Sequence, residues 1–67
     1  MTPLTRRERE VCGYLCLGWS NEQIGTKLQI SRRTVEDHRH HIFKKYAVHN
    51  AVELVREVYQ LADEVPA

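Results

Sequence analysis

Residues 20–46 contain two helical patterns that are separated by only a short turn. Ser20 and Gln23 have the spacing of a capping box, which predicts the start of a short helix. Ser31 can cap a second, longer helix. The buried side of this longer helix is indicated by residues at spacings of three and four, namely Val35, His38, Ile42 and Tyr46. A short helix, a tight turn and a longer helix with a polar outer side together form a helix-turn-helix, a common reader of double-stranded DNA.

Helical patterns also flank this segment. Thr5 and Glu8 form another capping box, and Gly18 suits the left-handed conformation that ends many helices. Asn50 and Glu53 repeat the capping pattern. Because the sequence shows neither sustained alternation nor a hairpin turn, we expect an all-α fold of four helices. The expected helices cover residues 6–17, 21–28, 32–46 and 51–62, in a single domain of residues 1–67 whose core lies at about 4–62.

The length of 67 residues permits one modest hydrophobic core. The chain has no run of about 20 apolar residues and no opening signal-peptide pattern, so we expect a cytoplasmic protein that does not contact membranes. Cys12 and Cys16 are four residues apart on one expected helix, which places them poorly for a disulfide, and they lack the paired spacings of a zinc module. We interpret them as semi-buried thiols and expect no metal site.

The net charge of only +1 conceals an uneven distribution. Residues 31–46 carry five cationic side chains against two carboxylates, a local charge of +3, whereas residues 47–67 sum to −3. The outer side of the helix at 32–46 presents Arg33, Asp37, His40 and Lys44. We expect this positively biased surface to face the phosphates of DNA.

These features occur in an order that closely resembles the LuxR-type (GerE-like) helix-turn-helix domain of bacterial transcription regulators. The resemblance covers residues 4 to about 61. It rests on the residues Leu4-Thr5-x-Arg7-Glu8-x-Glu10-Val11, Gly18-x-Ser20-Asn21, Ile24, Leu28-x-Ile30-Ser31, Thr34-Val35, His38, Ile42-x-x-Lys45 and Val48. It implies that the second and third helices form the helix-turn-helix, that the fourth helix pairs two copies, and that the protein is associated with the bacterial nucleoid when bound to DNA.

The resemblance also implies which side chains meet DNA. The base-reading candidates are Glu36, Asp37 and His40. The phosphate candidates, some implied by the family and some by their positive charge, are Ser31, Arg32, Arg33, Thr34, Lys44 and Lys45. The two carboxylates can accept hydrogen bonds from cytosine N4, or they can orient neighbouring arginines without reading bases. The residues alone leave both roles open.

Three residues depart from the family pattern. Gly25 stands where alanine is usual, and because both residues are small we expect the close helix crossing there to be retained. Ala47 replaces a glycine at the end of the third helix, where a left-handed conformation would cost alanine about 1 kcal/mol, so we expect that helix to end differently. Ala51 replaces an arginine and lacks whatever contact that arginine makes.

The fourth expected helix has a broad apolar side that could complete the core. Part of it exceeds what a small core requires, and such a surplus often marks an interface, so we expect a homodimer contact there. The candidates for this contact are Val52, Val55, Val58, Tyr59 and Ala62. The alternative is a protein-interaction module of the same fold that binds and modulates a related regulator.

We expect no enzyme activity and no cofactor, because the sequence contains neither a phosphate-binding loop nor a set of nucleophile and base. The predicted function is transcription regulation by a homodimer that binds an inverted repeat in double-stranded DNA. Members of the resembling family usually carry a receiver or ligand-binding domain before this module, for which 67 residues leave no room. We therefore expect either a stand-alone regulator or the output domain of a longer protein.

Overall fold

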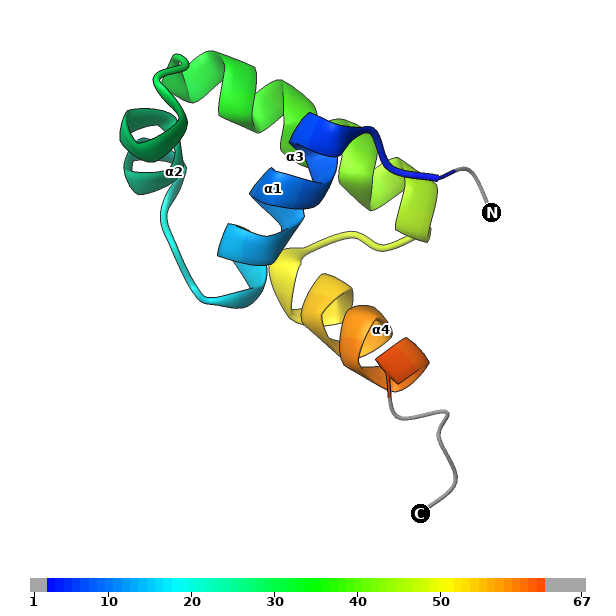
Figure 1. Ribbon diagram of the computed structural model, residues 1–67. Coiled ribbons are helices and arrows are strands. Elements are labelled where there is room, and N and C mark those ends of the chain that lie inside the picture. The colour runs from blue at the N-terminus through cyan, green and yellow to red at the C-terminus, as the bar shows by residue number, and fades with distance from the viewer. Residues whose placement is uncertain (1–2, 63–67) are drawn as a thin grey trace.

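The computed structural model describes residues 3–62 and the side chains of residues 3–60. This part of the chain forms four helices and no strand: α1 (Arg6–Cys16), α2 (Asn21–Leu28), α3 (Arg32–Tyr46) and α4 (Ala51–Ala62). The expected all-α fold is confirmed, while the outer ends of the expected domain, residues 1–2 and 63–67, lie outside the described residues. α1 lies at the centre and contacts both α3 and α4, and α2 packs on α3 (Figure 1). No helix in residues 3–62 is long and apolar enough to cross a membrane.

The helices begin where local hydrogen bonds can satisfy their free N–H groups. In α1 the Thr5 N–H donates to the Glu8 carboxylate at 2.9 Å, and the Glu8 N–H donates to the Thr5 hydroxyl at 3.1 Å. α2 repeats this capping box with Ser20 and Gln23. Both expected boxes are therefore confirmed.

The start of α4 differs in one detail from the expected box. The Glu53 N–H donates to Asn50 Oδ1 at 2.9 Å, as expected. The Glu53 carboxylate, however, accepts from the N–H of His49 at 2.7 Å and not from that of Asn50. The return bond is thus displaced by one residue toward the N-terminus.

Three helices end in the same way, on a residue in the left-handed conformation. Gly18 (φ +87°) follows α1, Gln29 (φ 57°) follows α2 and Ala47 (φ 56°) follows α3. After α3, the N–H groups of Ala47 and Val48 return to carbonyls of the last turn at 3.2 and 3.0 Å, which is a Schellman motif. The expectation that α3 would end differently is wrong: Ala47 takes up the strained conformation because these hydrogen bonds and the packing of Val48 on the core favour it.

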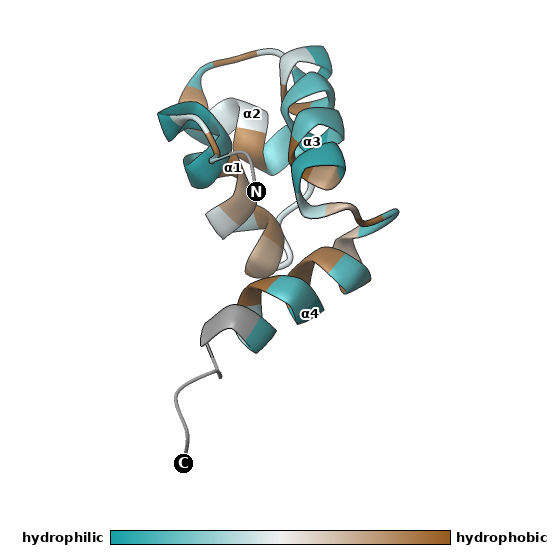
Figure 2. Cartoon of the chain, turned by 90° about the vertical axis from the view of Figure 1, so that its right-hand side faces the viewer, coloured by the Kyte–Doolittle hydropathy of each residue, from teal (hydrophilic) through white to brown (hydrophobic). Residues whose placement is uncertain are grey.

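The core lies between α1, α3 and α4, with one contribution from α2. Its buried apolar members are Val11, Cys12, Leu15, Ile24, Val35, Ile42 and Leu54. α4 turns hydrophobic residues toward this core and shows hydrophilic residues on the side seen in Figure 2, while Val52 and Tyr59 remain exposed. The core therefore holds α1 against both α3 and α4.

Gly25 makes its closest approach to the turn that leads into α3, and it also lies near the backbone of Arg32, the first residue of that helix. A Cβ atom at this position would lie 2.8 Å from the backbone oxygen of Ile30. The expected helix crossing is therefore corrected to a contact between α2 and the turn that leads into α3. Alanine would not fit this arrangement without a shift of the turn backbone.

Candidate nucleic-acid interface

The turn between α2 and α3 is short and is anchored at both ends. Ile30 is half-buried and packs against the core. Ser31 caps α3: its hydroxyl accepts from the Thr34 N–H at 3.0 Å and shares a hydrogen bond of 2.9 Å with the Thr34 hydroxyl. These contacts fix the direction in which α3 leaves the turn and place two hydroxyl groups at its N-terminus, the position that favours anions.

One side of α3 is held against α2 by charged groups. Arg32 donates from Nε to Glu36 at 3.1 Å and from Nη1 to Glu22 of α2 at 3.3 Å. All three side chains remain exposed, so the two ion pairs contribute little to stability. They do affect side-chain geometry, because the Arg32 guanidinium donates to both carboxylates and so links Glu36 to Glu22 of α2.

Arg39 makes a second link between these helices. Its Nη1 donates to Oδ1 of Asn21, the first residue of α2, at 2.8 Å. Its guanidinium carbon lies 5.3 Å from the centre of the Phe43 ring, within the range of a cation–π contact. Arg39 is therefore engaged with the protein and half-buried.

The side of α3 that faces α1 contains a buried ion pair. The Lys45 ammonium lies 2.6 Å from the Glu8 carboxylate and 3.3 Å from the backbone oxygen of Pro3. The side chains of Glu8 and Lys45 are only 6% and 21% exposed, and the His41 ring nitrogen Nδ1 lies 3.8 Å from the other carboxylate oxygen. The hydrogen bond from Lys45, and next that from the Thr5 backbone, lower the pKa of Glu8 below its usual value.

The sequence predicts a phosphate contact for Lys45 and only a helix cap for Glu8. The phosphate contact of Lys45 stays a prediction, and its ammonium would have to be shared with Glu8. A signal for the buried carboxylate is present in the sequence, because Glu8 shares the helical spacing of the buried residues Val11, Cys12 and Leu15. A charge on the apolar side of a helix requires a partner.

The outer side of α3 carries four exposed residues in one row. They are separated by four, three and four positions, which places them on one face of the helix: Arg33, Asp37, His40 and Lys44. Eleven residues at about 1.5 Å each give this outer row a length of about 16 Å. Within residues 3–60, no hydrogen bond or ion pair joins these four side chains to another residue. They are the members of the expected DNA surface that the fold does not use.

The candidates on α4 fall into two groups. Val52 and Tyr59 are 71% and 53% exposed, and Val55 is half-buried. Val58 packs against the core, so most of its surface belongs to the fold and not to an exposed face. The side chain of Ala62 lies outside the described residues.

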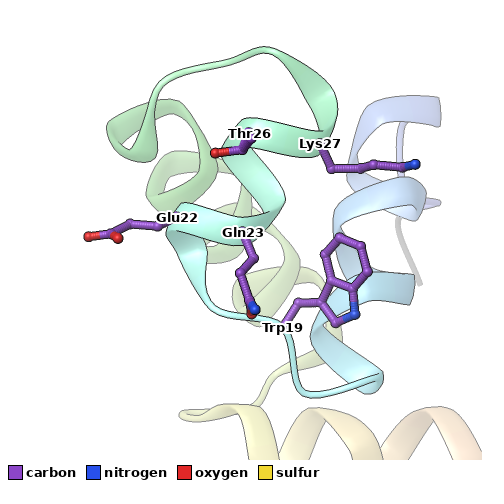
Figure 3. A pocket seen from close by; sticks show the side chains of 5 residues that line it. All are labelled: Trp19, Glu22, Gln23, Thr26 and Lys27. Atoms are coloured by element: carbon purple, nitrogen blue, oxygen red, sulfur yellow. The ribbon is translucent and has the colours of Figure 1, made fainter.

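The surface near the connection between α1 and α2 contains a hollow and not a row of charged residues. A shallow surface hollow is lined by Trp19, Glu22, Gln23, Thr26 and Lys27 (Figure 3). Glu22 and Thr26 point away from the indole, so the polar groups do not converge on one point (Figure 3). Trp19 stacks on Tyr14 with ring centres 4.4 Å apart, and both residues pack against the core.

The two cysteines are free and lie on the inner side of α1, as interpreted. Burial, and next the neighbouring Cys16, raises the pKa of the Cys12 thiol to about 11. Burial likewise raises the pKa of Cys16. Both thiols are therefore protonated at neutral pH, which makes them poor nucleophiles.

Comparison with known proteins agrees with this architecture. Residues 2–58 match the family described as bacterial regulatory proteins, luxR family. The response regulatory protein YgeK of Escherichia coli K12 is 41% identical over 58 residues, which cover 87% of this chain and 40% of that protein. The transcriptional regulatory protein UhpA of the same strain is 40% identical over 57 residues, 85% of this chain and 29% of UhpA.

A relative from another genus and a solved structure are also similar to this chain over part of their length. The response regulator TmoT of Ectopseudomonas mendocina is 39% identical, over 92% of this chain and 28% of its own length. The crystal structure of the response regulator ChrA, from a heme-sensing two-component system, superposes with a TM-score of 0.85 at 35% identity, over 92% of this chain and 31% of ChrA. This chain thus spans less than half the length of these relatives. The chain belongs to the luxR family of bacterial regulatory proteins.

Proposed function

We propose that this domain binds double-stranded DNA in a sequence-dependent way and thereby regulates transcription, with α3 in the major groove. The observation that carries the proposal is the outer row of α3, which is exposed, ends in cations and is unused by the fold. Two similar proteins are named response regulators and one a transcriptional regulatory protein, which supports the same role.

The two ends of the outer row suit phosphates. Arg33 lies in the first turn of α3, beside the hydroxyls of Ser31 and Thr34, and Lys44 lies in the last turn. Their separation of about 16 Å exceeds the width of about 12 Å of the major groove, so both cations can reach phosphates while the centre of the row faces bases. Arg32 can contribute only in competition with two carboxylates.

A homodimer is the second part of the proposal. Val52 and Tyr59 leave an exposed apolar strip on α4, with Val55 between them in sequence. If α4 pairs with its copy, two recognition helices about 34 Å apart would read an inverted repeat on one face of the duplex. The alternative, a module that captures a related regulator, draws on the same exposed strip.

Binding to DNA selected from a random library, followed by fluorescence titration at several salt concentrations, tests the proposal. We expect binding that weakens with salt and is abolished by the double change Arg33→Glu/Lys44→Glu. The control is Arg6→Glu, a charge reversal at an exposed position of α1, outside both the outer row and the exposed strip of α4. Salt-independent binding, or none, would refute the proposal.

The same charge reversal separates the two candidate functions. A module that captures another regulator through α4 would keep its function when Arg33 and Lys44 are reversed, whereas a DNA reader would lose it. Lys45 is unsuitable for this test, because its reversal would place a second carboxylate beside the buried Glu8.

A further inference from the structure

The two adjacent carboxylates of α3 have different surroundings. Glu36 is drawn toward α2 by Arg32, which also holds Glu22. Asp37 lies in the outer row, is exposed, and has no partner within residues 3–60. Resting on the proposed DNA binding, we infer that Asp37 determines base preference and selects cytosine, whereas Glu36 is held in an ion pair by Arg32 and does not read bases.

The preference for cytosine follows from the hydrogen-bonding capacity of an ionised carboxylate. It only accepts hydrogen bonds, and in the major groove guanine presents the acceptors O6 and N7 while thymine presents O4. Adenine has a donor at N6 but an acceptor at N7 on its own major-groove edge, whereas cytosine has N4 and no acceptor on its own edge. Asp37 therefore attracts cytosine and repels the other bases, and this repulsion adds to specificity.

The positions next to Asp37 assist this reading. His40 is one helical turn further along the outer row and can donate from a ring nitrogen to guanine. The rise between the two residues is about 4.5 Å, close to one base step of about 3.4 Å, so they face neighbouring base pairs. The cations Arg33 and Lys44 at the two ends hold the row in the groove despite the repulsion between Asp37 and phosphates.

The ion pair with Arg32 has a second consequence for Glu36. Its carboxylate already accepts from a guanidinium, and that guanidinium is shared with a residue of another helix. In the groove, Arg32 partly neutralises the charge of Glu36, which removes the repulsion that would make Glu36 selective. Asp37 has no ion pair within residues 3–60, so its charge is less neutralised by the fold than that of Glu36.

The experiment compares Asp37→Asn with its matched neighbour Glu36→Gln on a half-site in which each position is varied through all four bases. We expect the wild-type domain to prefer cytosine at one position by roughly 5- to 150-fold, the range of one good base contact. Asp37→Asn should shift that preference toward adenine, because an amide can pair with both N6 and N7. Glu36→Gln should leave the preference at every position unchanged.

The outcomes separate this inference from the proposal on which it rests. If the wild-type domain binds no DNA, the proposed function fails and the inference fails with it. If the domain binds DNA but Glu36→Gln changes the base preference while Asp37→Asn does not, the roles of the two carboxylates are reversed and the inference alone is overturned. It is also overturned if neither substitution changes the preference, since then no carboxylate reads the site. Circular dichroism of both variants confirms that they remain folded.

Discussion

Removing either partner of the ion pair between Glu8 and Lys45 should lower the free energy of unfolding. The size of the loss depends on which partner is removed. Lys45→Met leaves the Glu8 carboxylate, only 6% exposed, without its cation, and losing one partner of a buried pair costs about 3–5 kcal/mol. Glu8→Gln keeps the helix cap, as Gln23 does in α2, and strands an ammonium that is 21% exposed. Because this ammonium can reach water, we expect a smaller loss of about 1–3 kcal/mol.

These losses are large for a domain of this size. At about 0.05–0.15 kcal/mol per residue, the free energy of unfolding is about 3–10 kcal/mol, so Lys45→Met removes a large part of it. In a domain of 60–100 residues, each kcal/mol lowers Tm by about 4–8 °C. We therefore expect Lys45→Met to melt at least about 12 °C below the wild-type protein, or to be unfolded at 37 °C, and Glu8→Gln to melt between the two.

Thermal and urea denaturation at pH 7, followed by circular dichroism, measure this difference. Lys44→Met is the matched control, because it removes the same group from an exposed neighbouring residue and should change the free energy of unfolding by less than about 0.5 kcal/mol. The double variant Glu8→Gln/Lys45→Met should lose less than the sum of the two single losses, since both remove one interaction. Equal melting temperatures for Lys45→Met and Lys44→Met would show that the ion pair does not hold α3 on α1.

Three further predictions concern stability. Ala47→Gly should raise the free energy of unfolding by about 0.5–1 kcal/mol in urea titrations, because relief of the left-handed strain exceeds the entropy that glycine gains on unfolding; an unchanged or lower value would mean that Ala47 is not strained. Ser31→Ala should cost about 1 kcal/mol through loss of the α3 cap, whereas Ser20→Ala tests the same effect away from the outer row. Because the pKa of Glu8 is lowered from 4.5, its contribution to the free energy of unfolding is complete above that value and is lost as the pH falls through the folded-state pKa. Acid denaturation of the Glu8→Gln variant should lack this pH-dependent loss of stability. Identical acid profiles for the variant and the wild-type protein would contradict the prediction.

The helix boundaries could be predicted from the sequence because they depend on neighbouring residues. The boxes at Thr5 and Ser20 need only two side chains three positions apart, and the left-handed glycine at Gly18 needs only its own flexibility. Ala47 shows the limit of such local rules. Its preference for a right-handed conformation is overcome by the packing of Val48 on the core, which a local pattern does not contain.

The contacts that decide which charged side chains of α3 are paired within the fold join residues that are distant in the sequence. Lys45 meets Glu8, 37 positions earlier, and Arg32 meets Glu22 across the turn. Periodicity correctly placed Arg32 and Lys45 on α3, but it does not distinguish a cation that is free from one that is paired within the fold. Asp37 and Glu36 are adjacent carboxylates on one helix, but Glu36 pairs with Arg32, which also reaches Glu22 of α2, whereas Asp37 has no such partner within residues 3–60.

The pairing of some cations within the fold lowers the salt dependence of DNA binding below what the local charge of segment 31–46 suggests. Segment 31–46 has five cationic side chains, but Lys45 and Arg32 pair with carboxylates and Arg39 binds Asn21, which leaves Arg33 and Lys44 for phosphates. Each neutralised phosphate contributes about −0.9 to the slope of log affinity against log salt concentration, so two cations per protomer predict a slope of about −3.6 for a dimer. Lys44→Met should make the dimer slope shallower by about two, one for each protomer, and a folded Lys45→Met variant should not change it. A wild-type slope steeper than about −6 would mean that DNA draws Lys45 or Arg32 away from their carboxylates, and that the internal ion pairs do not limit the interface.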